Sequence, residues 1–184
     1  MAKLGSVAIQ DGGRTMPLDT YARRLAVQLT GRQHWSKDRG PEAYAGRDHM
    51  QLLCDLAFRG QDLLRKQLIA VENKPFKRLV RLDPERKFFS AAEIGSCKGI
   101  SDLLASLEAA RQGNPDVQAT KDQNRAMDLF AAANQVASLA SGEPLAIVPG
   151  GPQRPFLKVS ASGGDPGTER VREALSAFGQ AYTA

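Results

Sequence analysis

The chain has few of the residues on which metal and covalent chemistry usually depend. Its 184 residues include only two histidines, two cysteines and one tryptophan, and aromatic residues make up 6%. Two cysteines do not form the disulfide framework of a small secreted domain, so the sequence favours a reducing compartment. Because no ligand pair has the spacing of a metal motif and no cofactor motif is complete, we expect neither a metal nor a cofactor.

Long hydrophobic runs are also lacking. No stretch of about 18 apolar residues exists, which excludes a predicted membrane span. The first 15 residues contain only a short, weakly apolar run and none of the pattern of a cleaved secretion signal. We therefore expect a cytoplasmic protein where it is made. The polar start, with its serine and glycines, is also compatible with a leaderless bacterial secretion route.

The composition is that of a globular protein, with 42% hydrophobic and 24% charged residues. Its length fits one domain. Residues 1–16 hold little to bury and no helix caps, so they are predicted to form a flexible leader before a single compact domain of residues 17–184. The oligomeric state cannot be read from the sequence.

The organising element is the strongly periodic stretch 47–74. Its apolar residues recur at three- or four-residue steps, which predicts one amphipathic helix. These residues are Leu53, Ala57, Gly60, Leu64, Leu68 and Val71. Because a glycine weakens a helix by about 1 kcal/mol relative to alanine, Gly60 predicts a close crossing by another helix, with a break near 58–62 as the alternative. The alanine-rich stripe of residues 126–140 is suited to that crossing.

Other segments complete the predicted fold. Helical stripes occur at 18–30, 100–112 and 120–141, and a last helix is predicted from Asp165 onward. Short apolar runs predict strands at 76–82, 145–148 and 156–160, the last two as a hairpin. We predict an α+β fold, predominantly helical, with about five helices packed around a central helix and a small antiparallel β element at the edge.

Positive charge is concentrated in one segment. The net charge is +5, and residues 74–87 alone hold six basic residues against two acidic ones. A basic surface of this kind favours an acidic partner. The partner-binding residues that we predict are Lys74, Lys77, Arg78, Arg81, Arg86 and Lys87, together with Trp35 in the long polar stretch of residues 31–48. A buried ring that packs over the core is the alternative interpretation of Trp35.

One spot resembles the setting of a catalytic thiol. Cys97 follows Gly95-Ser96, precedes Lys98 and lies just before a predicted helix, where a helix dipole and a cation favour the thiolate. The base would have to be His49 or His34, since no histidine follows residue 49. These residues define the alternative hypothesis of a cysteine-dependent hydrolase or acyltransferase. The competing interpretation of Cys97 is an unreactive thiol in a turn.

The sequence thus supports three functional hypotheses. The first is a non-catalytic interaction protein, a bacterial or phage-type regulator or effector, that binds an acidic protein partner through its basic surface. The second is the thiol enzyme. The third is nucleic-acid binding through the same basic residues, although no nucleic-acid-binding motif is present and few aromatic residues lie nearby.

Overall fold

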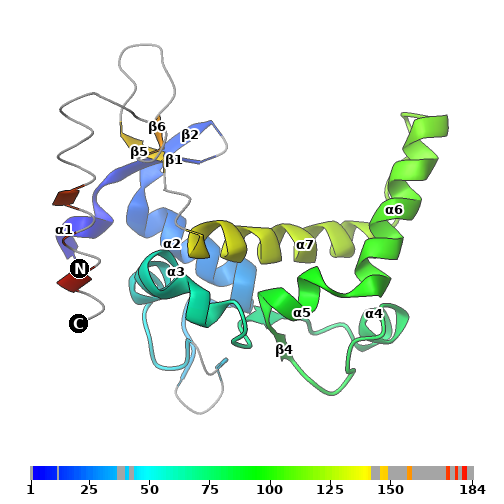
Figure 1. The fold of residues 1–184 in the computed structure, drawn as a ribbon, viewed down its shortest axis with the longest axis horizontal. Helices are drawn as coiled ribbons and strands as arrows, with labels where there is room; N and C mark the ends of the chain where they lie inside the picture. Colours follow the sequence, from blue (N-terminus) through cyan, green and yellow to red (C-terminus); the bar gives the residue numbers. More distant parts are fainter. Residues whose placement is uncertain are drawn as a thin grey trace.

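The fold is α+β and predominantly helical, as the sequence predicts (Figure 1). The computed structural model describes residues 2–11, 13–36, 40–41, 44–141, 146–148, 157–158, 173–174, 177 and 180–181. The helices are α1 Ala2–Gly5, α2 Leu18–Thr30, α3 His49–Leu63, α4 Lys74–Leu79, α5 Ala91–Gly95, α6 Lys98–Gly113 and α7 Lys121–Ala140. The strands are β1 Ala8–Asp11, β2 Arg14–Pro17, β3 Ile69–Ala70, β4 Phe88–Phe89, β5 Ala146–Val148 and β6 Leu157–Lys158. Within the described residues they form two-stranded antiparallel pairs, β1–β2, β3–β4 and β5–β6.

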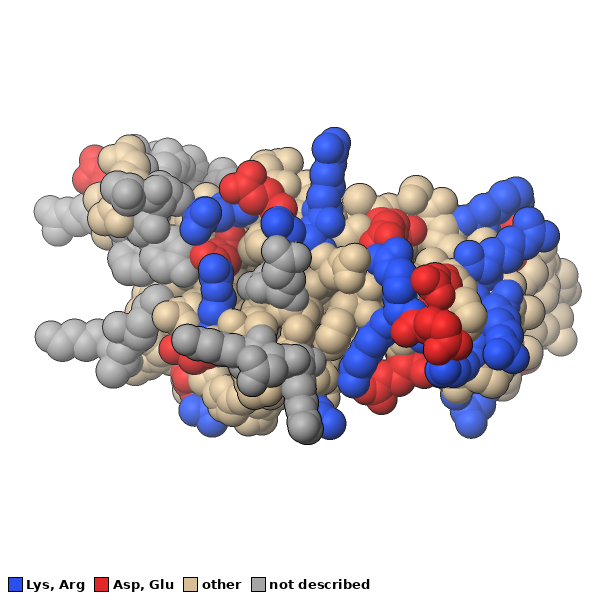
Figure 2. All heavy atoms as spheres, turned by 90° about the horizontal axis from the view of Figure 1, so that it is seen from below, with Lys and Arg blue, Asp and Glu red and all other residues tan. Residues whose placement is uncertain are grey.

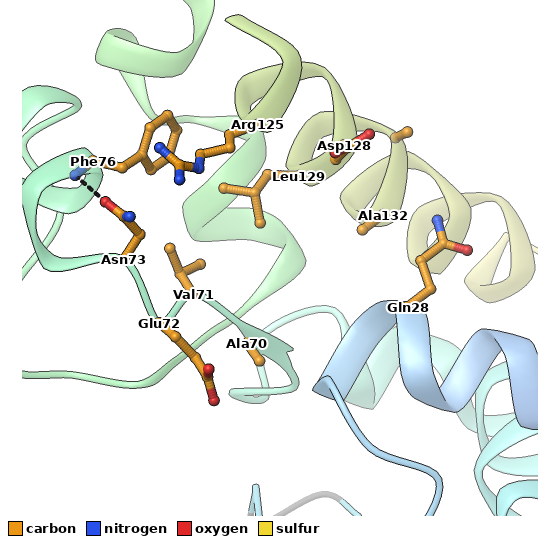
Figure 3. Close-up of a pocket in the computed structure, with 11 residues that line it drawn as sticks. Gln28, Ala70, Val71, Glu72, Asn73, Phe76, Arg125, Asp128, Leu129 and Ala132 are labelled. Carbon is orange, nitrogen blue, oxygen red and sulfur yellow. Dashed lines mark hydrogen bonds between the residues drawn. The ribbon is translucent and has the colours of Figure 1, made fainter. Parts of the chain in front are cut away.

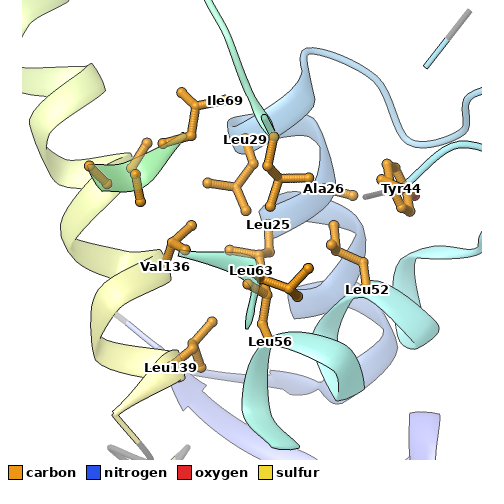
Figure 4. Close-up of a cluster of buried hydrophobic side chains, with 14 of the residues drawn as sticks. Leu25, Ala26, Leu29, Tyr44, Leu52, Leu56, Leu63, Ile69, Val136 and Leu139 are labelled. Carbon is orange, nitrogen blue, oxygen red and sulfur yellow. The ribbon is translucent and has the colours of Figure 1, made fainter. Parts of the chain in front are cut away.

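The core lies where α2 and α3 meet α7 (Figure 4). Leu25 and Leu29 of α2, Leu52 and Leu56 of α3, and Val136 of α7 are almost completely buried. Each such side chain contributes about 1.5–3 kcal/mol by leaving water. The apolar stripes of three helices therefore account for most of the packing that holds this part of the molecule together.

The predicted close crossing at Gly60 is confirmed. A Cβ added to Gly60 would lie 2.3 Å from the Cα atom of Ala140, so α3 and α7 approach backbone to backbone. Gln61 fixes the contact further, because its Nε2 donates to the Ala140 carbonyl at 3.0 Å. The alternative break also has a counterpart in the structure, since Arg59 has non-helical angles of φ −130° and ψ 20° that kink α3.

The central helix is shorter than predicted. It ends at Leu63 instead of continuing to residue 74. Leu68 and Val71 lie in an extended segment, where the Leu68 amide donates to the Phe89 carbonyl at 3.1 Å and the Val71 amide to the Lys87 carbonyl at 2.8 Å. A short apolar run satisfies helical and extended patterns alike, and here pairing with the β4 segment decides the outcome.

The strand predicted at 76–82 is wrong, because this segment begins as helix α4. Asn73 caps the helix, with its Oδ1 accepting from the Phe76 amide at 2.7 Å. Pro75 follows in the first turn, where its fixed φ suits a helix and its missing N–H has no partner to lose. Proline thus starts this helix rather than ending the preceding one.

Regular structure at the amino terminus was not predicted. The described residues of 1–16 form α1 and most of a β1–β2 hairpin, with Ile9 paired to Met16. Ile9 is only 1% exposed and belongs to the core. Residues 1–16 contain no cap or long apolar stripe by which this short hairpin could be recognised. The boundary between a leader and a domain at residues 16 and 17 stays a prediction.

The carboxyl-terminal third is described only in part. The predicted hairpin is present as β5 and β6, and β5 also lies against β1. Residues 173–174, 177 and 180–181 are helical. Asp165, the predicted start of the last helix, lies outside the described residues. In the part of the chain that the structure describes, no helix combines the length and hydrophobicity needed to cross a membrane.

Candidate functional site

Residues 74–98, which we call the basic corner, form one end of the described molecule. They comprise α4, β4, α5 and the first residue of α6. A capping box starts α5: the Ser90 hydroxyl accepts from the Glu93 amide, and the Glu93 carboxylate accepts from the Ser90 amide at 2.8 Å. Lys and Arg side chains gather at this end, with Asp and Glu side chains among them (Figure 2). The corner is therefore a mixed surface with a basic excess.

Three of the predicted binding cations are neutralised within the chain. Lys74 pairs with Glu85 at 2.7 Å, Arg86 with Glu93 at 2.8 Å, and Lys87 with Glu72 at 2.7 Å. The first and third pairs lie near the surface, where solvent screening limits their contribution to stability. Their charges are nevertheless partly compensated, so these cations attract an external anion less than their number suggests.

Lys77 is not a surface residue. It is 3% exposed, and its Nζ donates to the carbonyl of Arg86 at 2.6 Å. A buried ammonium needs such a partner, because removing the charge from water is costly. The buried Lys77 side chain therefore links α4 to the segment before β4. The sequence carries no signal that would separate it from its exposed neighbours.

Trp35 is also buried, at 8% exposure. Its Nε1 donates to the Thr30 hydroxyl at 2.9 Å, and its ring meets Phe88 edge to face at 5.4 Å. The guanidinium of Arg32 and the ammonium of Lys87 each lie 4.9 Å from the ring centre. The ring thus fastens the stretch after α2 to β4, in agreement with the packing alternative.

Two predicted cations remain open to a partner. Arg78 and Arg81 are exposed, and neither has an ion pair among the described residues. Leu79, which lies between them in the chain, is 54% exposed, one of two large hydrophobic residues of the described chain that stand out in this way. Arginine is enriched at protein interfaces, whereas a single exposed leucine is common on any protein surface.

The end of α4 holds Arg81 in an unusual backbone conformation. Its φ is 63°, the only positive φ of a described residue other than glycine. The Leu82 amide donates to the Lys77 carbonyl at 2.8 Å, and the Arg81 amide to the Arg78 carbonyl at 3.3 Å. These two bonds define a Schellman motif, in which the left-handed position is normally glycine. No sequence rule would have assigned that conformation to an arginine.

A pocket of about 330 Å³ opens beside this turn. Its charged lining comprises Arg81, Arg86, Lys98, Asp83 and Glu93. Lys98 pairs with Asp102 at 2.7 Å, and Arg86 with Glu93. The proximity of the Arg86 guanidinium lowers the pKa of Glu93 to about 2, so this carboxyl stays ionised at neutral pH. Arg81 is the one cation of this described lining without an ion pair, and Asp83, two residues later in the chain, is the one anion without an ion pair.

Cys97 lines the same pocket, but neither histidine does. Its Sγ donates to the Val80 carbonyl at 3.3 Å. His49 lies instead between α2 and α3, with Nε2 2.7 Å from an Asp19 oxygen and its ring 5.7 Å from that of His34. The two histidines therefore lie together, and neither is among the residues that contact the Cys97 thiol or line its pocket.

The second cysteine has no reactive setting either. Cys54 is buried on α3, and burial raises its pKa to about 11. Both cysteines are free thiols. Among the described residues, no cluster of three or more histidine, cysteine, aspartate or glutamate side chains could hold a metal ion.

Another pocket of the described residues was not predicted from the sequence. It measures about 480 Å³ and lies between α7 and the segment that leads from β3 into α4 (Figure 3). Val71, Phe76 and Leu129 form its apolar part, and Arg125 and Asp128 approach from α7. The charged side chains of its described lining are Glu72, Arg125 and Asp128.

Comparison with protein-family models finds no matching family, and comparison with curated proteins finds no similar sequence.

Proposed function

We propose that this protein is a non-catalytic interaction protein that binds an acidic protein partner through the basic corner. The observation that supports the proposal is the exposed trio at the end of α4, in which Arg78 and Arg81 lack internal ion pairs and Leu79 is 54% exposed. Unpaired guanidinium groups can pair with carboxylates, and the leucine supplies apolar contact. The remaining cations of the corner support the surface rather than contact the partner.

A protein suits this surface better than a nucleic acid does. Nucleic-acid affinity grows with the number of phosphates that the protein neutralises. Most cations of the corner already have acidic partners, among them Glu85 and Glu93, so few cations remain to neutralise phosphates. Two unpaired arginines around a leucine match a local acidic and apolar feature, such as a protein surface carries.

The thiol-enzyme hypothesis gains no support. Cys97 donates to a backbone carbonyl, His49 bonds to Asp19, and the His34 ring contacts the His49 ring edge to face. Free cysteines are usual in a reducing cytoplasm, and the two free cysteines therefore support a cytoplasmic location for the proposed function. Within the proposal we keep the class suggested by the sequence, a bacterial or phage-type regulator or effector, with leaderless export as its variant.

The test begins with capture of partners by the immobilised full chain, their identification by mass spectrometry and purification of each candidate. Affinity is then measured for the wild-type chain and for an Arg78→Glu/Arg81→Glu variant. We expect the double reversal to weaken binding by at least about tenfold, because interfacial arginines commonly contribute that much. Its Tm should stay close to the wild-type value, because neither side chain is paired or buried.

The matched control is Arg14→Glu, a reversal of an exposed charge on β2 at the other end of the molecule (Figure 1). It changes net charge in the same sense and should leave affinity almost unaltered. Lys77 is left out of the variants because reversing a buried charge would unfold the corner. Equal affinity of the wild-type chain and the double variant for every purified candidate would reject the proposed surface.

A further inference from the structure

The turn that carries Arg81 is clamped by the start of α6. A Cβ added to Gly99 would lie 2.5 Å from both the Cα and the carbonyl oxygen of Val80, so the two backbones are in direct contact. The Cys97 thiol donates to that same carbonyl oxygen at 3.3 Å. Val80 itself is 1% exposed. The residue before Arg81 is thus fixed on several sides, and the direction in which Arg81 leaves the helix is set before any partner arrives.

The conformation of Arg81 is unfavourable for its residue type. A left-handed φ brings Cβ close to the following carbonyl oxygen in every residue except glycine, and a Schellman motif gains nothing from an arginine there. Glycine would complete the same two hydrogen bonds without that strain. Residues held in such conformations are concentrated at binding sites, where a fixed geometry serves recognition.

The pocket of about 330 Å³ beside the turn is lined by charged residues of both signs. Arg86 and Lys98 are paired with Glu93 and Asp102, so Arg81 is the cation of the described lining that remains to pair with an entering carboxylate, which Asp83 at the same pocket repels. The planar fork of a guanidinium matches a carboxylate through two parallel hydrogen bonds. Because the turn is already ordered, little backbone entropy is lost when the pair forms.

We infer that Arg81 is the specificity-determining residue of the basic corner, and that the pocket beside it receives an aspartate or glutamate side chain of the partner. This inference rests on the proposed function. It assigns different roles to the two arginines: Arg81 pairs with the inserted carboxylate in the pocket, whereas Arg78 attracts the acidic surface around it. A phosphate group is the competing occupant, which the experiment distinguishes.

The experiment uses the full chain and a short fluorescein-labelled peptide in which glutamate alternates with glycine, followed by fluorescence anisotropy. A glutamine–glycine peptide of equal length is the uncharged control, and a single-stranded oligonucleotide of equal charge presents phosphates. The wild-type chain should bind the glutamate peptide most tightly. No binding of that peptide, or tighter binding of the oligonucleotide, would overturn the inference.

Variants at residue 81 separate backbone strain from recognition. Arg81→Gly should raise Tm by about 3 °C, because the left-handed strain is relieved in a chain of this size, yet weaken peptide binding by at least about tenfold. Asparagine also accepts this φ, so Arg81→Asn should change Tm and peptide affinity in the same directions as Arg81→Gly. Because asparagine is less flexible than glycine, that result would exclude added backbone flexibility as the cause of weaker binding. Arg81→Lys keeps charge and strain but loses the fork, so its Tm should stay unchanged and its affinity should be intermediate.

The outcome for Arg78→Glu shows which proposal has failed. If Arg78→Glu loses the peptide while Arg81→Gly binds it as well as the wild type, the basic corner stands as the binding surface and the role of Arg81 is wrong. If neither variant changes affinity, the surface itself is wrong. Loss of binding in Arg81→Gly with a raised Tm supports the inference, because a residue with a merely structural role would not improve stability when removed.

Discussion

At the scale of single residues, Glu93 joins two parts of the basic corner. Its carboxylate accepts from Arg86 Nη1 at 2.8 Å and from the Ser90 amide at 2.8 Å. The Arg86 contact is the main reason why the pKa of Glu93 falls to about 2, below its ordinary value of 4.5. Because the folded state holds the ionised form, this residue contributes stability above pH 4.5 and loses it as the pH falls toward about 2.

We predict that the free energy of unfolding of Glu93→Gln falls less steeply at acid pH than that of the wild type. The amide can still accept from the Ser90 backbone, so the helix cap is kept while the charge is removed. Since the Glu93 side chain is 40% exposed, solvent screening reduces the effect to about 1 kcal/mol. Urea unfolding at about pH 6 and about pH 3 measures it: the wild type should lose about 1 kcal/mol more between these conditions than the variant. Parallel losses in both proteins would contradict the assignment.

The sequence identified the charges of the basic corner but not their surroundings. Composition alone locates Lys77, Arg78 and Arg81 in one basic segment. Burial separates them, because Lys77 is enclosed and donates to the carbonyl of Arg86, whereas the two arginines face solvent. The difference between Lys77 and Arg78 depends on which side of a six-residue helix each residue takes, whereas Arg81 lies in the turn beyond the end of that helix. In the strand that was predicted here, successive side chains would point to opposite faces, which is not how they are arranged in the helix that forms. The error in secondary structure therefore led to errors in the predicted site.

At the scale of elements, the same residue type has opposite roles in two helices. Gly60 lies under Ala140, where an added Cβ would be 2.3 Å from a backbone atom. Gly113, at the end of α6, has no atom within 4 Å of such a Cβ. Glycine is therefore required where α3 and α7 cross, whereas at Gly113 it only adds conformational freedom to the unfolded chain.

We predict opposite signs for the two alanine variants. Gly60→Ala should destabilise the fold by about 2–3 kcal/mol, because α3 and α7 must separate. Gly113→Ala should stabilise it by about 0.5–1 kcal/mol by restricting the unfolded chain. Thermal and urea unfolding of both variants under identical conditions provide the comparison. An unchanged or raised stability of Gly60→Ala would mean that the close approach does not exist in solution.

Helix prediction succeeded where a stripe and a cap occurred together. The Thr120–Gln123 capping box and the alanine stripe after it correspond to α7, and the stripe at 18–30 corresponds to α2, which Gly31 ends with a left-handed φ of 78°. It failed after Leu63, where the chain leaves the helical pattern without a proline or a run of glycines. The segment from Leu68 to Val71 is extended because β4, some 20 residues later in the chain, provides its hydrogen-bond partners. Such a distant partner cannot be read from a local window.

At the scale of the whole molecule, segments from distant parts of the chain lie side by side. The described residues of β1, near the start, contact β5, which follows α7 (Figure 1). The β1–β2 hairpin also contacts α2, and Ile9 is buried with the residues of that helix. The first residues thus contribute to the core, a role that their polar composition concealed.

The final prediction concerns whether residues 1–16 can be removed. Ile9→Ala should destabilise the protein by about 2–4 kcal/mol, because a fully buried isoleucine leaves a cavity that its neighbours fill only in part. For a chain of this size, each kcal/mol corresponds to a Tm shift of about 2–4 °C. Thr15→Ala, at an exposed position of β2, is the control and should leave Tm nearly unchanged. A chain that begins at residue 17 should lose at least as much stability as Ile9→Ala, because it lacks the whole of β1. If truncation and point variant both melt with the wild type, these residues are a dispensable leader and the core is complete without them.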